Sequence, residues 1–142
     1  MLVRLLYASR ATGAVDADAT AAILRQSKAN NAACGITGVL CCCAQGTFLQ
    51  VLEGGRVAVN RLYHRIAADP RHTELLLLGY EEITERRFAG WSMGLVNLSR
   101  LNPALVLKYS ESSTLDPYAV SGAVSMALCE ELVASAAVVG QT

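Results

Sequence analysis

An α+β fold is predicted by the order in which strand-like and helix-like segments follow one another along the 142 residues. Short runs of aliphatic and β-branched residues are separated by two segments whose apolar positions recur at helical spacing. The turn sequence "AQG" joins two of these runs as a hairpin. Hydrophobic residues make up 53% of the chain and charged residues 17%, which excludes a disordered chain and indicates one domain with a buried core.

The first half of the chain is predicted to form three strands and one helix. In order, these are a strand over residues 2–8, a helix over residues 17–31, and hairpin strands over residues 35–43 and 47–53. Side chains alternate between the two faces of a strand, so Gln50 shares a face with Phe48 and Leu52 in an otherwise apolar run. A buried amide there has to find hydrogen-bond partners.

The next part of the chain repeats the pattern with one helix and two strands. In order, these are a helix over residues 56–69, a strand over residues 74–83, and a strand within residues 86–98. Pro70 follows the helix closely, as expected of a residue that stops it. Alternation along the last strand is expected to place Trp91, Met93 and Leu95 on one face.

The element order β-α-β-β-α-β-β indicates a ferredoxin-like topology in its first six elements, with both helices on one face of the sheet. We expect the first and third strands to be neighbouring parallel strands at the centre of that sheet. Their inward faces then bring Tyr7 and Gln50 close together beneath the two helices.

The C-terminal part differs from the rest, which divides the chain into a main domain over residues 1–100 and a helical cap over residues 101–142 without a separate effector domain. Asp116-Pro117 predicts a helix start, and residues 118–139 are apolar around most of a helical surface. This helix is expected to cover the second face of the sheet. Its small-residue stripe is expected to allow close packing against another subunit, giving at least a dimer; the stripe comprises Ser121, Ser125 and Cys129.

Charge and cysteine content exclude several classes of function. Twelve basic residues balance twelve acidic ones, so no basic field points to nucleic acid or to a membrane surface. The five cysteines contain no CxxC pattern and have no ligand-like spacing to the two histidines, so no metal site is expected. Free thiols are typical of a reducing compartment, and we expect a cytoplasmic protein.

A set of neutral polar side chains is expected to point inward from the first strand, the first helix and the third strand. It comprises Tyr7, Ser27, Asn30, Asn31 and Gln50. These groups form no acid–base pair and no nucleophile–base set, so the chain is not expected to be an enzyme. Amides and a phenol suit a flat heteroaromatic ligand that has donors and acceptors on its edge.

The order and spacing of these motifs resemble those of the BLUF photoreceptors, which sense blue light with flavin. The matching segments are "LLYASRA", "SKANNAACGITGVL", "FLQVLEG", "DPRH" and "ITERRFAGWSM". The resemblance covers roughly residues 2–96. Taken singly, each residue also fits a structural role, such as core packing for Trp91 and Met93 or a helix terminus for Asn30 and Asn31.

The resemblance implies a light-driven cycle in a noncovalently bound flavin, expected to be FAD, with FMN and riboflavin left open. It implies that Tyr7 donates an electron and a proton, and that Gln50 rearranges its hydrogen bonds to give a red-shifted state. Trp91 and Met93 are the pair implied to exchange positions near Gln50. The residues expected to contact the flavin are Tyr7, Ile23, Ser27, Lys28, Asn30, Asn31, Phe48, Gln50, Leu52, Arg65 and Ile66.

A sensor of this length is expected to signal through another protein or through its own assembly. Two other functions stay open on the sequence alone. One is a small acylphosphatase-like enzyme, which needs an anion cradle that the loop "SRATGAVDA" does not clearly supply. The other is an oligomeric binding module without a cofactor.

Overall fold

The computed structural model of the chain describes residues 1–13 and 17–135, and within α1 it leaves the side chains of residues 17–24 and 26 undescribed. It contains one five-stranded sheet with the order β4-β1-β3-β2-β5. The strands are β1 (Leu2–Ala11), β2 (Thr37–Cys42), β3 (Thr47–Gly55), β4 (His72–Ile83) and β5 (Gly94–Asn97). The helices are α1 (Ala17–Cys34), α2 (Arg56–Ala68), α3 (Pro103–Leu107) and α4 (Gly122–Ala134), with short 3-10 turns at Ala44–Gly46 and Leu98–Arg100.

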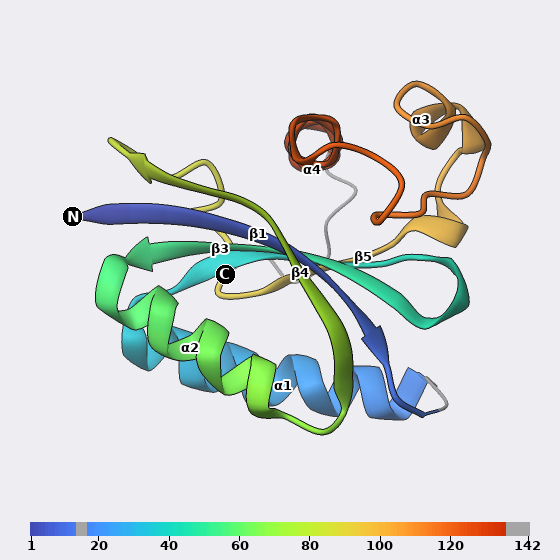
Figure 1. The fold of residues 1–142 in the computed structure, drawn as a ribbon. Helices are drawn as coiled ribbons and strands as arrows, with labels where there is room; N and C mark the ends of the chain where they lie inside the picture. Colours follow the sequence, from blue (N-terminus) through green and yellow to red (C-terminus); the bar gives the residue numbers. More distant parts are fainter. Residues whose placement is uncertain (14–16, 136–142) are drawn as a thin grey trace.

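The two faces of the sheet are covered by different helices, as predicted (Figure 1). We call the face under α1 and α2 the helix face, and the face under α4 the cap face. On the helix face, Tyr7, Phe48 and Leu52 belong to one apolar cluster that also contacts α2. On the cap face, Leu6 and Val51 belong to a second cluster that includes buried residues of α4. The α+β, ferredoxin-like prediction is therefore confirmed.

The predicted direction of the two central strands is wrong. The first and third strands are neighbours, but β1 pairs with β3 in antiparallel register, with Tyr7 opposite Gln50. The physical reason is the tight turn that contains Gln45 and Gly46, both at positive φ. This turn reverses the chain after β2, which itself runs in the direction of β1.

The C-terminal helix begins later than predicted. Asp116 accepts a hydrogen bond from the backbone N–H of Tyr118 within a turn, and α4 starts only after Ser121, whose hydroxyl accepts from Val124 N at 3.1 Å. Gly122 is required at this start, because a Cβ there would lie 2.3 Å from the carbonyl oxygen of Leu78. Contact with the sheet thus decides where the helix begins.

The proposed stripe of small residues on α4 faces inward. Ser125 and Cys129 are fully buried, and the Cys129 thiol interacts with the Cys41 thiol of β2, which together with burial raises the pKa of Cys41. Ser121 is exposed and caps the helix. Ser125 and Cys129 therefore pack within the chain itself, so these two residues are not available for contact with a second subunit.

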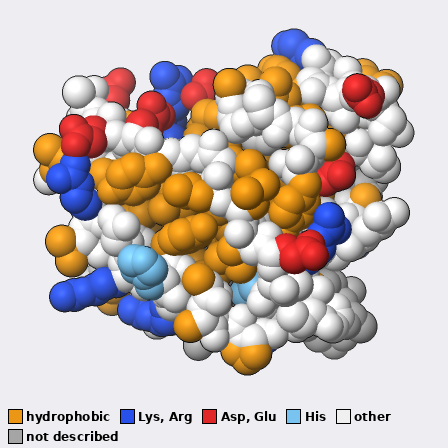
Figure 2. Space-filling view, viewed as in Figure 1, with side chains coloured by type: hydrophobic (Ala, Val, Ile, Leu, Met, Phe, Trp, Pro, Cys, Tyr) orange, Lys and Arg blue, Asp and Glu red, His pale blue; other side chains and the backbone are white. Residues whose placement is uncertain are grey.

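The outer edge of β4 pairs with no strand among the described residues. Figure 2 shows apolar side chains gathered along this strand and beside it. Its large exposed apolar residues are Leu76, Leu77 and Tyr80. None of the helices in the described part of the chain combines the length and apolar character needed to cross a membrane.

Candidate functional site

Tyr7 and Gln50 form the centre of the candidate site. They are a cross-strand pair of β1 and β3, and both are buried. The Tyr7 hydroxyl donates a hydrogen bond to Oε1 of Gln50, and Nε2 of Gln50 donates to Sδ of Met93 at 3.2 Å. The buried amide in an apolar strand is therefore bonded on both ends, once by a phenol and once by a thioether.

Burial also sets the electrostatics of this pair. Loss of hydration raises the pKa of the Tyr7 phenol far above its usual range, and the nearby Tyr63 hydroxyl raises it further. Tyr63 of α2 lies edge-on to the Tyr7 ring, with 5.4 Å between the ring centroids. Tyr7 therefore stays protonated at every ordinary pH.

The C-terminal end of α1 positions Asn31. Gly35 adopts a left-handed φ of 70°, and the N–H of Ile36 donates back to the carbonyl of Asn31 at 2.9 Å. This is the Schellman arrangement that ends many helices. The side chain of Asn31 is buried, and its Nδ2 donates to the carbonyl oxygen of Ser92 at 3.0 Å. The neighbouring Asn30 is exposed, so the prediction that Asn30 points inward is wrong, because successive residues of a helix face different directions.

The other predicted contact residues divide by location. Phe48 and Leu52 are buried in the apolar wall next to Tyr7, and Ile66 packs against it from α2. Ser27 and Lys28 are half-buried on α1, and Arg65 is exposed on α2. Ile23 lies on α1, but its side chain falls outside the described residues.

Trp91 and Met93 do not share a face, so this prediction is wrong. The last strand begins only at Gly94, and the residues before it do not alternate as a strand does. Trp91 packs in the cluster of the cap face, whereas Met93 packs with Tyr7 on the helix face. The Trp91 indole N–H is buried without a hydrogen-bond partner within the described part of the chain.

Sequence reasoning did not assign a role to two residues near the site. Tyr63 contacts the Tyr7 ring; its place on the apolar side of α2 was the available signal. Glu53 of β3 is fully buried and bonded to Arg4, its cross-strand neighbour. Arg4 and Glu53 each interrupt an apolar strand with a charged residue, and this pattern in the sequence could have indicated that the two form a pair.

The donor set of the helix face fits a flavin by its chemistry. Tyr7, Gln50 and Asn31 are neutral, hold hydrogen-bonding groups at the edge of an apolar wall, and come from three different elements. A flat ring with carbonyl and N–H groups on its rim needs such partners.

Comparison with known proteins identifies the family. Residues 2–94 match the family model of BLUF domains, described as sensors of blue light using FAD. The chain therefore belongs to the BLUF family of blue-light flavin sensors. The acylphosphatase-like enzyme and the cofactor-free module are not favoured by this assignment.

Related proteins agree with this assignment. Over 93 residues the chain is 38% identical to photoactivated adenylate cyclase subunit beta of Euglena longa, matching 65% of this chain and 11% of that protein. The chain thus spans only about a tenth of the length of these curated relatives.

Solved structures resemble the chain over different extents. The dark-state structure of BlrB, a BLUF protein, has 36% identity and a TM-score of 0.79, covering 95% of this chain and 96% of that one. The photo-activated state of BlsA has 30% identity and a TM-score of 0.84, covering 100% and 99%. A bacterial light-regulated adenylyl cyclase has 40% identity and a TM-score of 0.68, covering 72% of this chain and 30% of that one.

Proposed function

We propose that Tyr7, Gln50 and Met93 form the light-responsive hydrogen-bond chain of this sensor. The single observation that carries the proposal is that Gln50 bonds to a phenol through its oxygen and to a thioether through its nitrogen. An amide has two opposite polar ends, so turning it exchanges an acceptor for a donor at each partner. Both orientations fit the same space, which makes Gln50 suited to a two-state element.

A bound flavin would supply the absorption of blue light and act as the electron acceptor. Tyr7 would donate the electron, and its hydroxyl proton would pass to the Gln50 oxygen with which it is hydrogen-bonded. Gln50 would turn or tautomerise while it holds that proton. Return of the electron and the proton to Tyr7 would leave Gln50 in its new orientation, to which we assign the red-shifted state.

A free-energy difference of about 1.4 kcal/mol between the two bond patterns changes their populations tenfold. One neutral hydrogen bond contributes about that much. Gain or loss of the Gln50–Met93 contact is therefore enough to set which pattern dominates in the dark.

We propose that the residues predicted to contact the flavin do so from three locations. Asn31 would present its amide from the end of α1, Phe48, Leu52 and Ile66 would supply apolar contact, and Tyr7 and Gln50 would reach the ring edge. The remaining proposed contacts are Ile23, Ser27, Lys28, Asn30 and Arg65. We propose that exposed Arg65 and half-buried Lys28 contact the phosphate end of the cofactor, a role that FAD or FMN fits and riboflavin does not.

Light-minus-dark absorption of the purified, flavin-loaded protein tests the hydrogen-bond chain. The wild type is expected to shift its flavin bands to the red under blue light and to recover in darkness. Tyr7→Phe and Gln50→Leu are expected to keep the flavin and lose the shift. Tyr63→Phe is the matched control, because it removes a hydroxyl beside Tyr7 without removing the bond to Gln50, and it is expected to keep the shift. A normal shift in Gln50→Leu contradicts the proposal.

The identity of the flavin is tested separately. Flavin released by heating the protein is expected to have the mass of FAD, as the family's description indicates. FMN or riboflavin alone in that fraction contradicts this choice. The Arg65→Ala variant is expected to weaken FAD binding more than riboflavin binding.

Output through another protein is also part of the proposal. We propose that residues 1–100 sense light, that residues 101–142 carry the response to a protein partner, and that the chain acts as a homo-oligomer in the cytoplasm without catalytic activity of its own. Light scattering over a range of concentrations tests the assembly, and a monomer at all of them contradicts it. Because Ser125 and Cys129 are buried within one chain, the contact between subunits has to use another surface.

A further inference from the structure

The segment between β4 and β5 passes from one face of the sheet to the other. We call residues 84–93 the bridging segment. Phe88 and Trp91 pack in the cluster of the cap face, whereas Met93 packs in the cluster of the helix face. The carbonyl of Trp91 accepts a hydrogen bond from Gly38 N at 2.9 Å, so the segment runs beside β2. Because Met93 and Trp91 belong to the same short segment, the backbone between them transmits a displacement of Met93 to the cap face.

Strand β3 holds the bridging segment on both faces. On the helix face, Gln50 contacts Met93 through Nε2 and Sδ at 3.2 Å. On the cap face, Oε1 of Glu53 accepts hydrogen bonds from Phe88 N at 2.7 Å and from Arg87 N at 3.1 Å. Gln50 and Glu53 are three positions apart on one strand, which is why their side chains point to opposite faces.

The two oxygens of Glu53 share the contacts of Arg4 and the bridging segment. Oε2 accepts from Nε of Arg4 at 2.8 Å and lies 2.8 Å from Nη2 of the same side chain. Oε1 accepts from Phe88 N at 2.7 Å and from Arg87 N at 3.1 Å, and Arg87 N also lies 3.2 Å from Oε2. The carboxylate is fully buried and Arg4 is 6% exposed. Hydrogen bonds with an ionised partner are the stronger kind, and breaking one in a buried site leaves the other partner uncompensated. This end of the segment is thus tied to the sheet.

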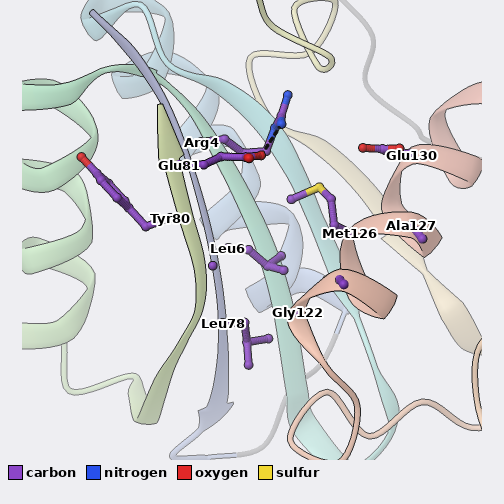
Figure 3. A pocket seen from close by; sticks show the side chains of 11 residues that line it. Arg4, Leu6, Leu78, Tyr80, Glu81, Gly122, Met126, Ala127 and Glu130 are labelled. Carbon is purple, nitrogen blue, oxygen red and sulfur yellow. Dashed lines mark hydrogen bonds and ion pairs between the residues drawn. The ribbon is translucent and has the colours of Figure 1, made fainter. Parts of the chain in front are cut away.

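Residues 87–88, the end of the bridging segment bonded to Glu53, are also connected through ion pairs to α4 and to the protein surface. Arg87 forms an ion pair with Glu130 of α4 at 3.3 Å, and Arg4 forms a second ion pair with Glu81 of β4 at 2.7 Å. Arg4, Glu81 and Glu130 line one end of a groove of about 330 Å³ between α4 and strands β1 and β4 (Figure 3). Arg4, the partner of Glu53, and Glu130, the partner of Arg87, therefore also line an exposed groove.

We propose that Glu53 is a positioning residue of the light response. Its carboxylate anchors residues 87–88, so that a rearrangement at Gln50 moves Trp91 relative to the cap face instead of shifting the whole bridging segment. The proposal rests on the proposed function, since it requires that Gln50 rearranges. It assigns the direction of the signal: from Gln50 through Met93 and Trp91 to α4.

The variant Glu53→Gln tests the anchor without changing its size. A glutamine has one acceptor and one donor end, so it cannot accept from both Arg4 and the two N–H groups. Glu81→Gln is the matched control. It makes the same chemical change on the other, exposed carboxylate that contacts Arg4, and no hydrogen bond joins that side chain to residues 87–88.

Trp91 is the single tryptophan of the chain, so 5-fluorotryptophan gives one fluorine NMR signal for the bridging segment. In the wild type this signal is expected to move on illumination and to return at the rate of flavin recovery. In Glu53→Gln the flavin red shift is expected to remain, while the movement of the fluorine signal falls to about half or less and dark recovery changes about threefold or more. Glu81→Gln is expected to match the wild type in all three measurements.

Hydrogen–deuterium exchange of the wild type gives a second test that needs no variant. The amides of Arg87 and Phe88 are expected to stay equally protected in light and darkness, while amides of residues 90–93 change. This test decides the matter if Glu53→Gln does not fold.

The outcomes separate the two proposals. If the wild type shows no red shift, the proposed function fails. If the red shift is present but Glu53→Gln behaves like Glu81→Gln, or residues 87–88 lose protection in the light, the role of Glu53 is overturned.

Discussion

The helix face and the cap face of the sheet differ in how tightly they are covered. Helices α2 and α4 have 13 residues each, yet α2 buries only Val59 whereas α4 buries Ser125, Leu128, Cys129 and Leu132. The cap face is therefore largely a packed core, with the groove beside Arg4 at one end. The helix face keeps half-buried side chains next to its polar centre, as a face that receives a ligand requires.

The polar groups of the two faces differ in charge. The helix face carries neutral groups, Tyr7, Gln50 and Asn31, whose bonds are exchanged at a cost of about 1 kcal/mol each. The cap face carries the buried ion pair of Arg4 and Glu53. Neutral bonds allow rearrangement and buried charged bonds resist it, so one strand, β3, offers a movable contact on one face and a fixed contact on the other.

The largest loss of stability is expected when the buried ion pair of Arg4 and Glu53 is broken. Arg4→Ala leaves the Glu53 carboxylate buried without its cation, which is expected to lower the free energy of unfolding by about 3–5 kcal/mol. Urea denaturation of the flavin-saturated protein measures this. A loss below about 1 kcal/mol would mean that water reaches Glu53 and that the cap face is not closed.

A similar or slightly smaller effect is expected from the apolar part of the cap face. Leu128→Ala removes a fully buried side chain and is expected to cost about 2–5 kcal/mol, because the packed sheet cannot close the cavity. The matched change on α2 is Ile66→Ala at a half-buried position. It is expected to lower the free energy of unfolding by about half as much as Leu128→Ala, or less. Equal losses in urea denaturation at saturating flavin would remove the contrast between the faces.

A smaller effect on stability is expected from the centre of the helix face. Tyr7→Phe removes one neutral hydrogen bond to Gln50 and is expected to cost about 1 kcal/mol, although it abolishes the red shift. Denaturation and difference absorption measured on the same sample check both parts. A destabilisation as large as that of Arg4→Ala would show that Tyr7 is chiefly a structural residue.

The smallest effect concerns His72, at the start of β4 where it contacts Ser9 and the Phe48 ring. Burial lowers its pKa, with Asp69 opposing and Arg71 adding to that shift. The unfolded chain therefore binds a proton more readily, so stability from this group is present above about pH 6.5 and is lost as the pH falls below it.

Thermal unfolding at pH 7.5 and 5.5 tests this sign. The loss of melting temperature between the two is expected to be smaller in His72→Gln than in the wild type, by about 2 °C or less because solvent screens the partly exposed ring. His64→Gln, at an exposed position of α2, is the control. A larger loss in His72→Gln than in the wild type contradicts the assigned direction.

The sequence was sufficient to predict the layers of the fold and the centre of the site. Period-two alternation placed Tyr7 and Gln50 on the inward face, and their register as direct neighbours follows from the order of the strands. It also placed Leu6, Leu49 and Val51 toward the C-terminal helix. These features follow from local patterns once a ferredoxin-like topology is assumed, so the sequence of one chain was sufficient to predict them.

Two features depended on tertiary contacts that no local pattern records. Trp91 and Met93 were assigned to one face, yet the bridging segment is held by Gly38 and Glu53 and crosses between the faces. Asp116-Pro117 has the form of a helix start, but Tyr118 is held elsewhere, by the carbonyl of Glu74 and by Arg10 over its ring.

By itself, the sequence determined that Tyr7, Gln50 and the aliphatic positions of the strands are buried, because alternation is a property of the local chain. The antiparallel direction of β1 and β3, the start of α4 and the separation of Trp91 from Met93 were decided only by the tertiary structure. Each depends on a partner distant in the chain: β1 on its pairing with β3, Gly122 on the carbonyl of Leu78, and residues 87–88 on Glu53. A single local pattern does not encode such pairings.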